Sequence, residues 1–188
     1  MKHSFNKEKM LTIGILPAMW LIYFLFEVFS GRVNDLYTLI LNLSLILVFA
    51  LTGWIIYKCS TQRPNGVNNK SLLITFMILM LLDQGLKLII KLNYFDNYFE
   101  IIPNFLSFNP IINTQGSWLN ARFNFNISFP LLVLINGISL ILFIEIYRYI
   151  KIKTGKNFWT DMCFLFIFAG ALCSFIDKVF YGGSLDFI

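Results

Sequence analysis

Charged residues and histidine are scarce in this sequence of 188 residues, and its cysteines form no motif. Only 13% of the residues are charged, whereas soluble domains carry about 25%. The single histidine, His3, excludes most histidine-based mechanisms and metal sites. The three cysteines, Cys59, Cys163 and Cys173, lack CxxC spacing, so neither a zinc site nor a disulfide framework is indicated.

Hydrophobic residues are abundant, at 57% of the chain. A helix needs about 20 residues to cross the hydrocarbon core, and helices are expected because lipid cannot satisfy backbone polar groups. Five apolar stretches are long enough: 10–29, 36–57, 71–90, 127–147 and 158–180. The first continues past the length of a signal-peptide core and is interpreted as a retained span. We therefore predict an all-α, polytopic membrane helix bundle with about five transmembrane helices and a long external loop.

Basic residues predict the orientation of these helices. Three lie before the first span, three in the loop after the second and four in the loop after the fourth: Lys2, Lys7, Lys9, Lys58, Arg63, Lys70, Arg148, Lys151, Lys153 and Lys156. Basic loops face the cytoplasm. We therefore expect a cytoplasmic N-terminus, an external carboxyl end, and external connections at 30–35 and 91–126.

A polar segment at 59–70, with Pro64, Asn65 and Gly66, divides the sequence. It predicts a two-helix N-terminal segment, residues 1–70, followed by a three-helix body, residues 71–188. The external connection at 91–126 is rich in aromatic residues that suit the membrane interface. Within it, Ile101, Ile102, Phe105 and Leu106 are compatible with a short strand or an interfacial helix. Nucleic acid is not expected as a partner of an outer-face loop.

Asp83 and Lys87 provide the first polar pair inside a predicted span. Because they are four residues apart, they share a helix face and can form an ion pair. An acid within a bilayer is costly and indicates function, but a purely structural ion pair is an equal alternative. Glu145 and Asp161, near the cytoplasmic ends of spans four and five, are expected to be interfacial or paired with nearby Lys and Arg.

Asn113 and Gly116 stand out in the external connection. The amide of Asn113 can hold a carboxylate or a peptide carbonyl, and Gly116 lets the backbone turn close to another chain. The alternative is an ordinary Asx turn.

The last span ends in a second group of polar residues. Ser174 and Asp177 are three apart on one face, and Gly182 and Gly183 break the helix, which would return Asp186 towards the bundle. A small-residue face for close helix packing is also expected at Gly170, Ala171 and Ser174. The alternative is a frayed helix end with solvated acids.

In this order, the motifs resemble those of lipoprotein signal peptidase, or signal peptidase II. Its D-x-x-[ST]-K is matched by 83–87, with Leu86 at the hydroxyl position, and its N-x-G loosely by 113–116, with one extra residue. Its G-A-L-G-N-x-x-D-R is matched by 170–178, with Cys, Ser and Lys at the Gly, Asn and Arg positions. Its G-x-V-x-D-F-[IL] is matched in outline by 182–188. The resemblance covers about 72–188.

The resemblance implies an intramembrane aspartic endopeptidase in the cytoplasmic membrane of a bacterium. Its partners would be membrane lipid and the signal peptide of a prolipoprotein, and no metal or cofactor is implied. Asp186 corresponds to the first catalytic aspartate of the family. The resemblance gives supporting or substrate-binding roles to Asp83, Lys87, Asn113, Gly116, Ser174 and Asp177.

One family motif, the F-N-x-A-D segment with the second catalytic aspartate, has no match up to residue 188. An aspartic dyad needs two carboxylates that share a proton, so the dyad is expected to be incomplete in this chain. Another acid or another membrane chain would have to complete it. The alternatives are a non-catalytic lipoprotein- or lipid-binding accessory protein, a small transporter with a polar pathway, and a structural subunit.

Overall fold

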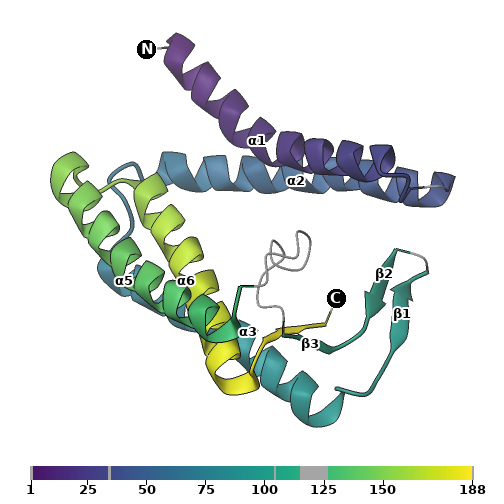
Figure 1. Ribbon diagram of the computed structural model, residues 1–188. Coiled ribbons are helices and arrows are strands. Elements are labelled where there is room, and N and C mark those ends of the chain that lie inside the picture. The colour runs from purple at the N-terminus through teal and green to yellow at the C-terminus, as the bar shows by residue number, and fades with distance from the viewer. Residues whose placement is uncertain (1, 34, 104, 115–126, 188) are drawn as a thin grey trace. The chain divides into compact units, whose positions relative to one another are not determined.

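The structure is a computed structural model, which describes residues 2–33, 35–103, 105–114 and 127–187 (Figure 1). In these ranges five helices are long and apolar enough to cross a membrane, which confirms the predicted spans. They are α1 (Lys2–Phe29), α2 (Leu36–Gln62), α3 (Asn69–Asn93), α5 (Phe129–Thr154) and α6 (Phe158–Tyr181). The fourth span begins later than predicted because Ser128 is the N-cap residue and Pro130 occupies the first turn.

The chain divides into two compact units, Met1–Pro64 and Asn65–Ile188. In the first unit, α1 and α2 form a helical hairpin. Their contact is close at Gly53, where an added Cβ would lie 2.8 Å from the Thr12 carbonyl oxygen. The Trp20 indole N–H donates to the Asn42 carbonyl oxygen at 2.9 Å. The assignment of residues 1–70 and 71–188 to two domains stays a prediction.

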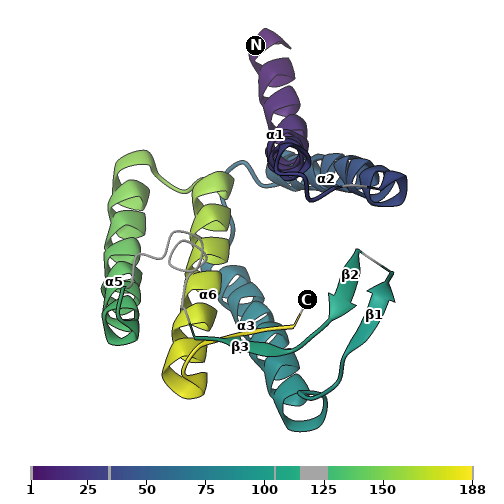
Figure 2. The same cartoon turned by 45° about the vertical axis from the view of Figure 1, so that its right-hand side comes forward.

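In the second unit, α6 packs against both α5 and α3 (Figure 2). The α5–α6 contact includes stacked rings of Tyr147 and Phe164, with centroids 4.0 Å apart. A short connection makes the two helices antiparallel neighbours, with Gly155 at the end of α5 in a positive-φ conformation (φ 77°). The Asn157 side chain then caps α6 by accepting the Trp159 N–H at 2.8 Å.

In the part of the chain that the structure describes, four short strands lie outside the helices. The strands β1 (Phe99–Ile102) and β2 (Leu106–Phe108) form an antiparallel pair, so the segment around Ile101 is a strand rather than an interfacial helix. The strands β3 (Ile111–Asn113) and β4 (Ser184–Asp186) form a second antiparallel pair. This second pair joins the segment before α5 to the segment after α6, and it determines where Asp186 lies.

Candidate active site

Lys87 of α3 joins two carboxylates. Its Nζ lies 2.6 Å from Asp177 Oδ2 on α6 and 2.9 Å from Asp83 Oδ2 on α3. Lys87 is 8% exposed and Asp177 is fully buried. The Asp83–Lys87 pair predicted from the i,i+4 spacing is therefore present, and the structure adds Asp177 from a second helix.

Gln84, for which the sequence predicted no role, completes this cluster. Its Nε2 donates to Asp177 Oδ1 at 2.9 Å and to Asp83 Oδ2 at 3.0 Å. Both oxygens of Asp177 thus accept hydrogen bonds, one from an amide and one from an ammonium group. In the sequence, the feature that indicates such a role is an amide side chain directly after an aspartate within an apolar helix. The arrangement makes Asp177 a buried link between α3 and α6.

Lys178 brings a second positive charge to this end of α6. It is buried, and its Nζ donates to Ser174 Oγ at 2.5 Å. It also interacts electrostatically with Asp177 and Asp186. Ser174 therefore contacts Lys178, although the sequence placed it on the face of Asp177. Gly170 has open space around it within the described residues, so the close helix packing expected there is absent.

The position of Asp186 follows from the way α6 ends. Gly182 adopts the left-handed conformation (φ 70°) that ends many helices. An added Cβ on Gly183 would lie 2.7 Å from the Asn113 carbonyl oxygen, so β4 approaches β3 as closely as only glycine permits. The register then places Asp186 opposite Ile111 and Ser184 opposite Asn113.

The carboxylate of Asp186 accepts two hydrogen bonds from neutral groups. Asn113 Nδ2 donates to Oδ2 at 3.3 Å, and Ser184 Oγ donates to Oδ1 at 3.2 Å. Among the described residues, no ion pair includes Asp186. The amide of Asn113 thus holds a carboxylate, as its sequence suggested. Gly116 lies outside the described residues.

A pocket of about 290 Å³ lies beside the cluster. Its lining includes Asp83, Lys87, Asp177 and Ser184, so the polar residues of three elements face one space. Asp186 is two residues beyond Ser184 on the same strand. No three His, Cys, Asp or Glu residues in the described ranges are grouped as metal ligands would be. The lining of this pocket combines apolar side chains with two acids and Lys87.

Asp161, at the other end of α6, was expected to be interfacial or paired with Lys or Arg, and this was wrong. It is 1% exposed. Its Oδ2 accepts the Val67 backbone N–H and its Oδ1 accepts the Tyr147 hydroxyl, each at 2.8 Å. Neutral donors satisfy it because the loop before α3 approaches it closely at Gly66, where an added Cβ would lie 2.7 Å from Oδ2. Glu145 does pair with Arg148, at 3.0 Å.

Comparison with known proteins places this geometry in context. The sequence model described as signal peptidase (SPase) II matches residues 75–188. The lipoprotein signal peptidase of Staphylococcus haemolyticus is 33% identical over 120 residues, which are 62% of this chain and 70% of the relative. That of Staphylococcus epidermidis is 36% identical over 122 residues, or 63% of this chain and 69% of the relative. No solved structure matches the chain.

Proposed function

The chain belongs to the signal peptidase II family, and from this we infer that it takes part in the cleavage of prolipoprotein signal peptides. It is a multi-pass bacterial membrane protein. The substrate class follows from the names of its relatives, which are lipoprotein signal peptidases. Asp186 is proposed as one carboxylate of an aspartic dyad.

The state of the Asp186 carboxylate is the observation that supports this role most directly. Three carboxylates gather at this end of α6, and two of them, Asp83 and Asp177, form ion pairs with Lys87. Among the described residues, the third acid, Asp186, accepts hydrogen bonds from neutral donors only. A carboxylate that is not committed to an ion pair is able to accept a proton from water during hydrolysis.

A dyad also needs a second acid. Asp177 is unsuitable because it is fully buried and both of its oxygens are occupied. Asp83 is held by Lys87 and Gln84. We therefore propose that the second carboxylate is neither of these two residues and comes from another group, for which a second membrane chain is one source. Asp83, Lys87 and Asp177 then act as positioning residues for the substrate pocket.

The orientation proposed from the basic loops puts this site at the outer face of the cytoplasmic membrane, with the N-terminus in the cytoplasm. A cysteine introduced at Asp96, in a variant without native cysteines, should react with a membrane-impermeant thiol reagent in intact cells. A cysteine at Lys153 should react only after lysis. The opposite pattern would reverse the orientation and place the site in the cytoplasm.

Cleavage of a diacylglyceryl-modified prolipoprotein peptide by protein purified in detergent tests the activity. Asp186→Asn should lower the rate by roughly 10²–10⁴-fold, the usual contribution of a general acid or base. Asp96→Asn is the matched control, since Asp96 is an exposed acid outside the site. Equal rates for wild type and Asp186→Asn would refute the catalytic role.

A non-catalytic accessory protein on the same bundle is the second candidate, and it is favoured because Asp83 and Asp177, in the described part of the chain, are engaged in ion pairs and hydrogen bonds. It predicts that the wild-type protein binds the lipidated precursor but leaves it intact. Binding should then survive Asp186→Asn. Cleavage by the wild-type protein would exclude this candidate.

A further inference from the structure

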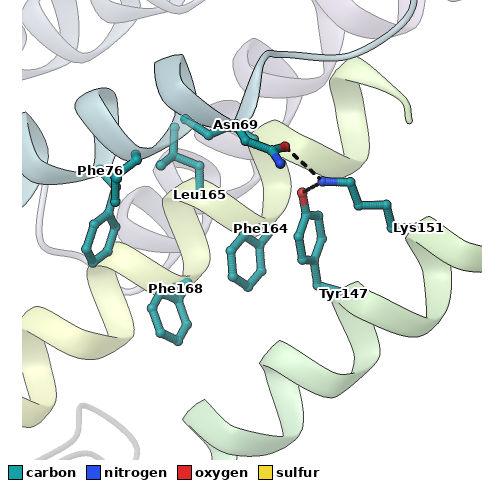
Figure 3. Close-up of a pocket in the computed structure, with 9 residues that line it drawn as sticks. Asn69, Phe76, Tyr147, Lys151, Phe164, Leu165 and Phe168 are labelled. Atoms are coloured by element: carbon teal, nitrogen blue, oxygen red, sulfur yellow. Dashed lines mark hydrogen bonds between the residues drawn. The ribbon is translucent and has the colours of Figure 1, made fainter. Parts of the chain in front are cut away.

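A second pocket, of about 400 Å³, lies between the helices near the end that carries Asp161 (Figure 3). It is formed by α3, α5 and α6, all within the second unit. Polar groups lie at one end of it and apolar side chains form the rest. The proposed peptidase function uses none of these residues.

Lys151 is the charged residue at the polar end. Its Nζ donates to the Tyr147 hydroxyl at 2.9 Å and to Asn69 Oδ1 at 3.5 Å. The Tyr147 hydroxyl in turn donates to the buried Asp161. In the described part of the chain, no carboxylate lies within ion-pair distance of Lys151. Among the described residues, this positive charge is thus held in position by neutral oxygens and not by a carboxylate.

Aromatic rings continue from Lys151 along the pocket. The ring centroids of Tyr147 and Phe164 are 4.0 Å apart, and those of Phe164 and Phe168 are 5.2 Å apart. Phe76 of α3 follows, with its ring 5.9 Å from that of Phe168. Figure 3 shows these rings leading away from the ammonium group. The pocket therefore has a cationic head and an apolar tail.

We propose that this pocket binds one anionic phospholipid, with its phosphate on Lys151 and an acyl chain along the aromatic rings. The shape of the site matches an amphipathic ligand that carries its negative charge at one end. The source is the adjacent leaflet, because the pocket lies between membrane-spanning helices. Lys151 and Lys153 occupy the last turn of α5, and anionic headgroups gather near such basic helix ends.

Native mass spectrometry in detergent tests this proposal, with phosphatidylglycerol and phosphatidylcholine of the same acyl chains as probes. The wild-type protein should retain one phosphatidylglycerol in preference to phosphatidylcholine. Lys151→Ala should weaken phosphatidylglycerol binding by about fivefold, as expected for one charge near a headgroup. Lys153→Ala is the matched control, since Lys153 is an exposed lysine on the same helix that does not line the pocket.

A second variant tests the tail of the pocket. Leu73 lines it and is 62% exposed, so Leu73→Trp fills the pocket without disturbing a buried side chain. It should weaken binding of both lipids while Lys151 stays in place. Glycerol phosphate at a large excess should not displace the lipid, because it lacks the acyl chain. Equal binding of both lipids to wild type, or equal losses in Lys151→Ala and Lys153→Ala, would overturn the proposal.

Discussion

The two buried aspartates of α6, one near each end of the helix, are stabilised in different ways. Asp177 is matched by the charge of Lys87 at 2.6 Å and by an amide donor. Within the described residues, Asp161 accepts only a backbone N–H and a tyrosine hydroxyl. At the Asp177 end, Lys87 is therefore engaged in a structural ion pair, and Asp186 can take part in chemistry. At the Asp161 end, the acid is engaged in structural hydrogen bonds, and Lys151 can bind a negatively charged ligand.

The largest loss of stability is expected when the ion pair between Lys87 and Asp177 is broken. Lys87→Met leaves Asp177 fully buried without its cation, and removal of one partner from a buried pair costs about 3–5 kcal/mol. The free energy of unfolding in detergent should fall by that amount. Asp83→Asn should cost much less, because the side chain of Asp83 is 38% exposed and Lys87 keeps Asp177.

A double variant separates charge burial from general damage at this site. Lys87→Met combined with Asp177→Leu removes both charges and should recover part of the lost stability, because no buried charge remains unpaired. If Asp177→Leu instead lowers the stability of Lys87→Met further, the loss in Lys87→Met does not come from an unpaired buried charge. Asp177 would then not depend on a charged partner in the way that distinguishes it from Asp161.

A smaller loss of stability is expected at Asp161, which accepts hydrogen bonds from neutral donors. Asp161→Ala leaves the Val67 N–H and the Tyr147 hydroxyl without their acceptor, and an unsatisfied buried group costs about 1–3 kcal/mol. Tyr147→Phe removes only one of these bonds and should cost about 1 kcal/mol. Thermal unfolding of the three proteins tests this order. A loss in Asp161→Ala above that of Lys87→Met would reverse the comparison.

Alanine variants of two glycines, one near Asp186 and one near Asp161, should separate an effect on function from an effect on stability. Gly183→Ala would place a Cβ 2.7 Å from the Asn113 carbonyl oxygen, which displaces β4 and with it Asp186. Gly66→Ala would place a Cβ 2.7 Å from Asp161 Oδ2 at a residue with φ +83°. Each change should cost about 1–3 kcal/mol. Peptide cleavage should fall at least tenfold in Gly183→Ala but not in Gly66→Ala.

Gly85→Ala is the control for both glycine variants, because nothing lies within 4 Å of an added Cβ there. It should preserve stability and activity, since alanine is the better helix former. If Gly66→Ala lowers cleavage as much as Gly183→Ala, the two ends of α6 are not functionally separate.

Local patterns in the sequence predicted what depends on neighbouring residues. The apolar runs predicted five helices, and the four-residue spacing predicted the Asp83–Lys87 pair, because helix geometry alone brings these side chains together. The sequence could not indicate that Asp177, 90 residues from Lys87, joins the pair, since that depends on how α3 packs against α6.

The pairing of β3 with β4 was equally inaccessible, because three-residue strands have too few positions for an alternating pattern. Asp161 was misjudged for a related reason. Its carboxylate accepts the backbone N–H of Val67, 94 residues away, and a backbone donor leaves no signature in residue type. The resemblance to a family supplied the role of Asp186, which spacing alone did not.

The smallest effect is expected at an exposed aspartate, which serves as a reference for the two buried ones. Asp35 caps α2 by accepting the Thr38 N–H at 2.7 Å, and this bond holds the pKa of its carboxyl below the ordinary value of 3.8. A lowered folded-state pKa stabilises the protein above the ordinary value, and this contribution is lost as the pH falls through the folded pKa. Asp35→Asn keeps a capping side chain but does not titrate. Between neutral pH and about pH 3, wild type should therefore lose slightly more thermal stability than Asp35→Asn, whereas equal losses would show that the cap contributes no charge-dependent stability.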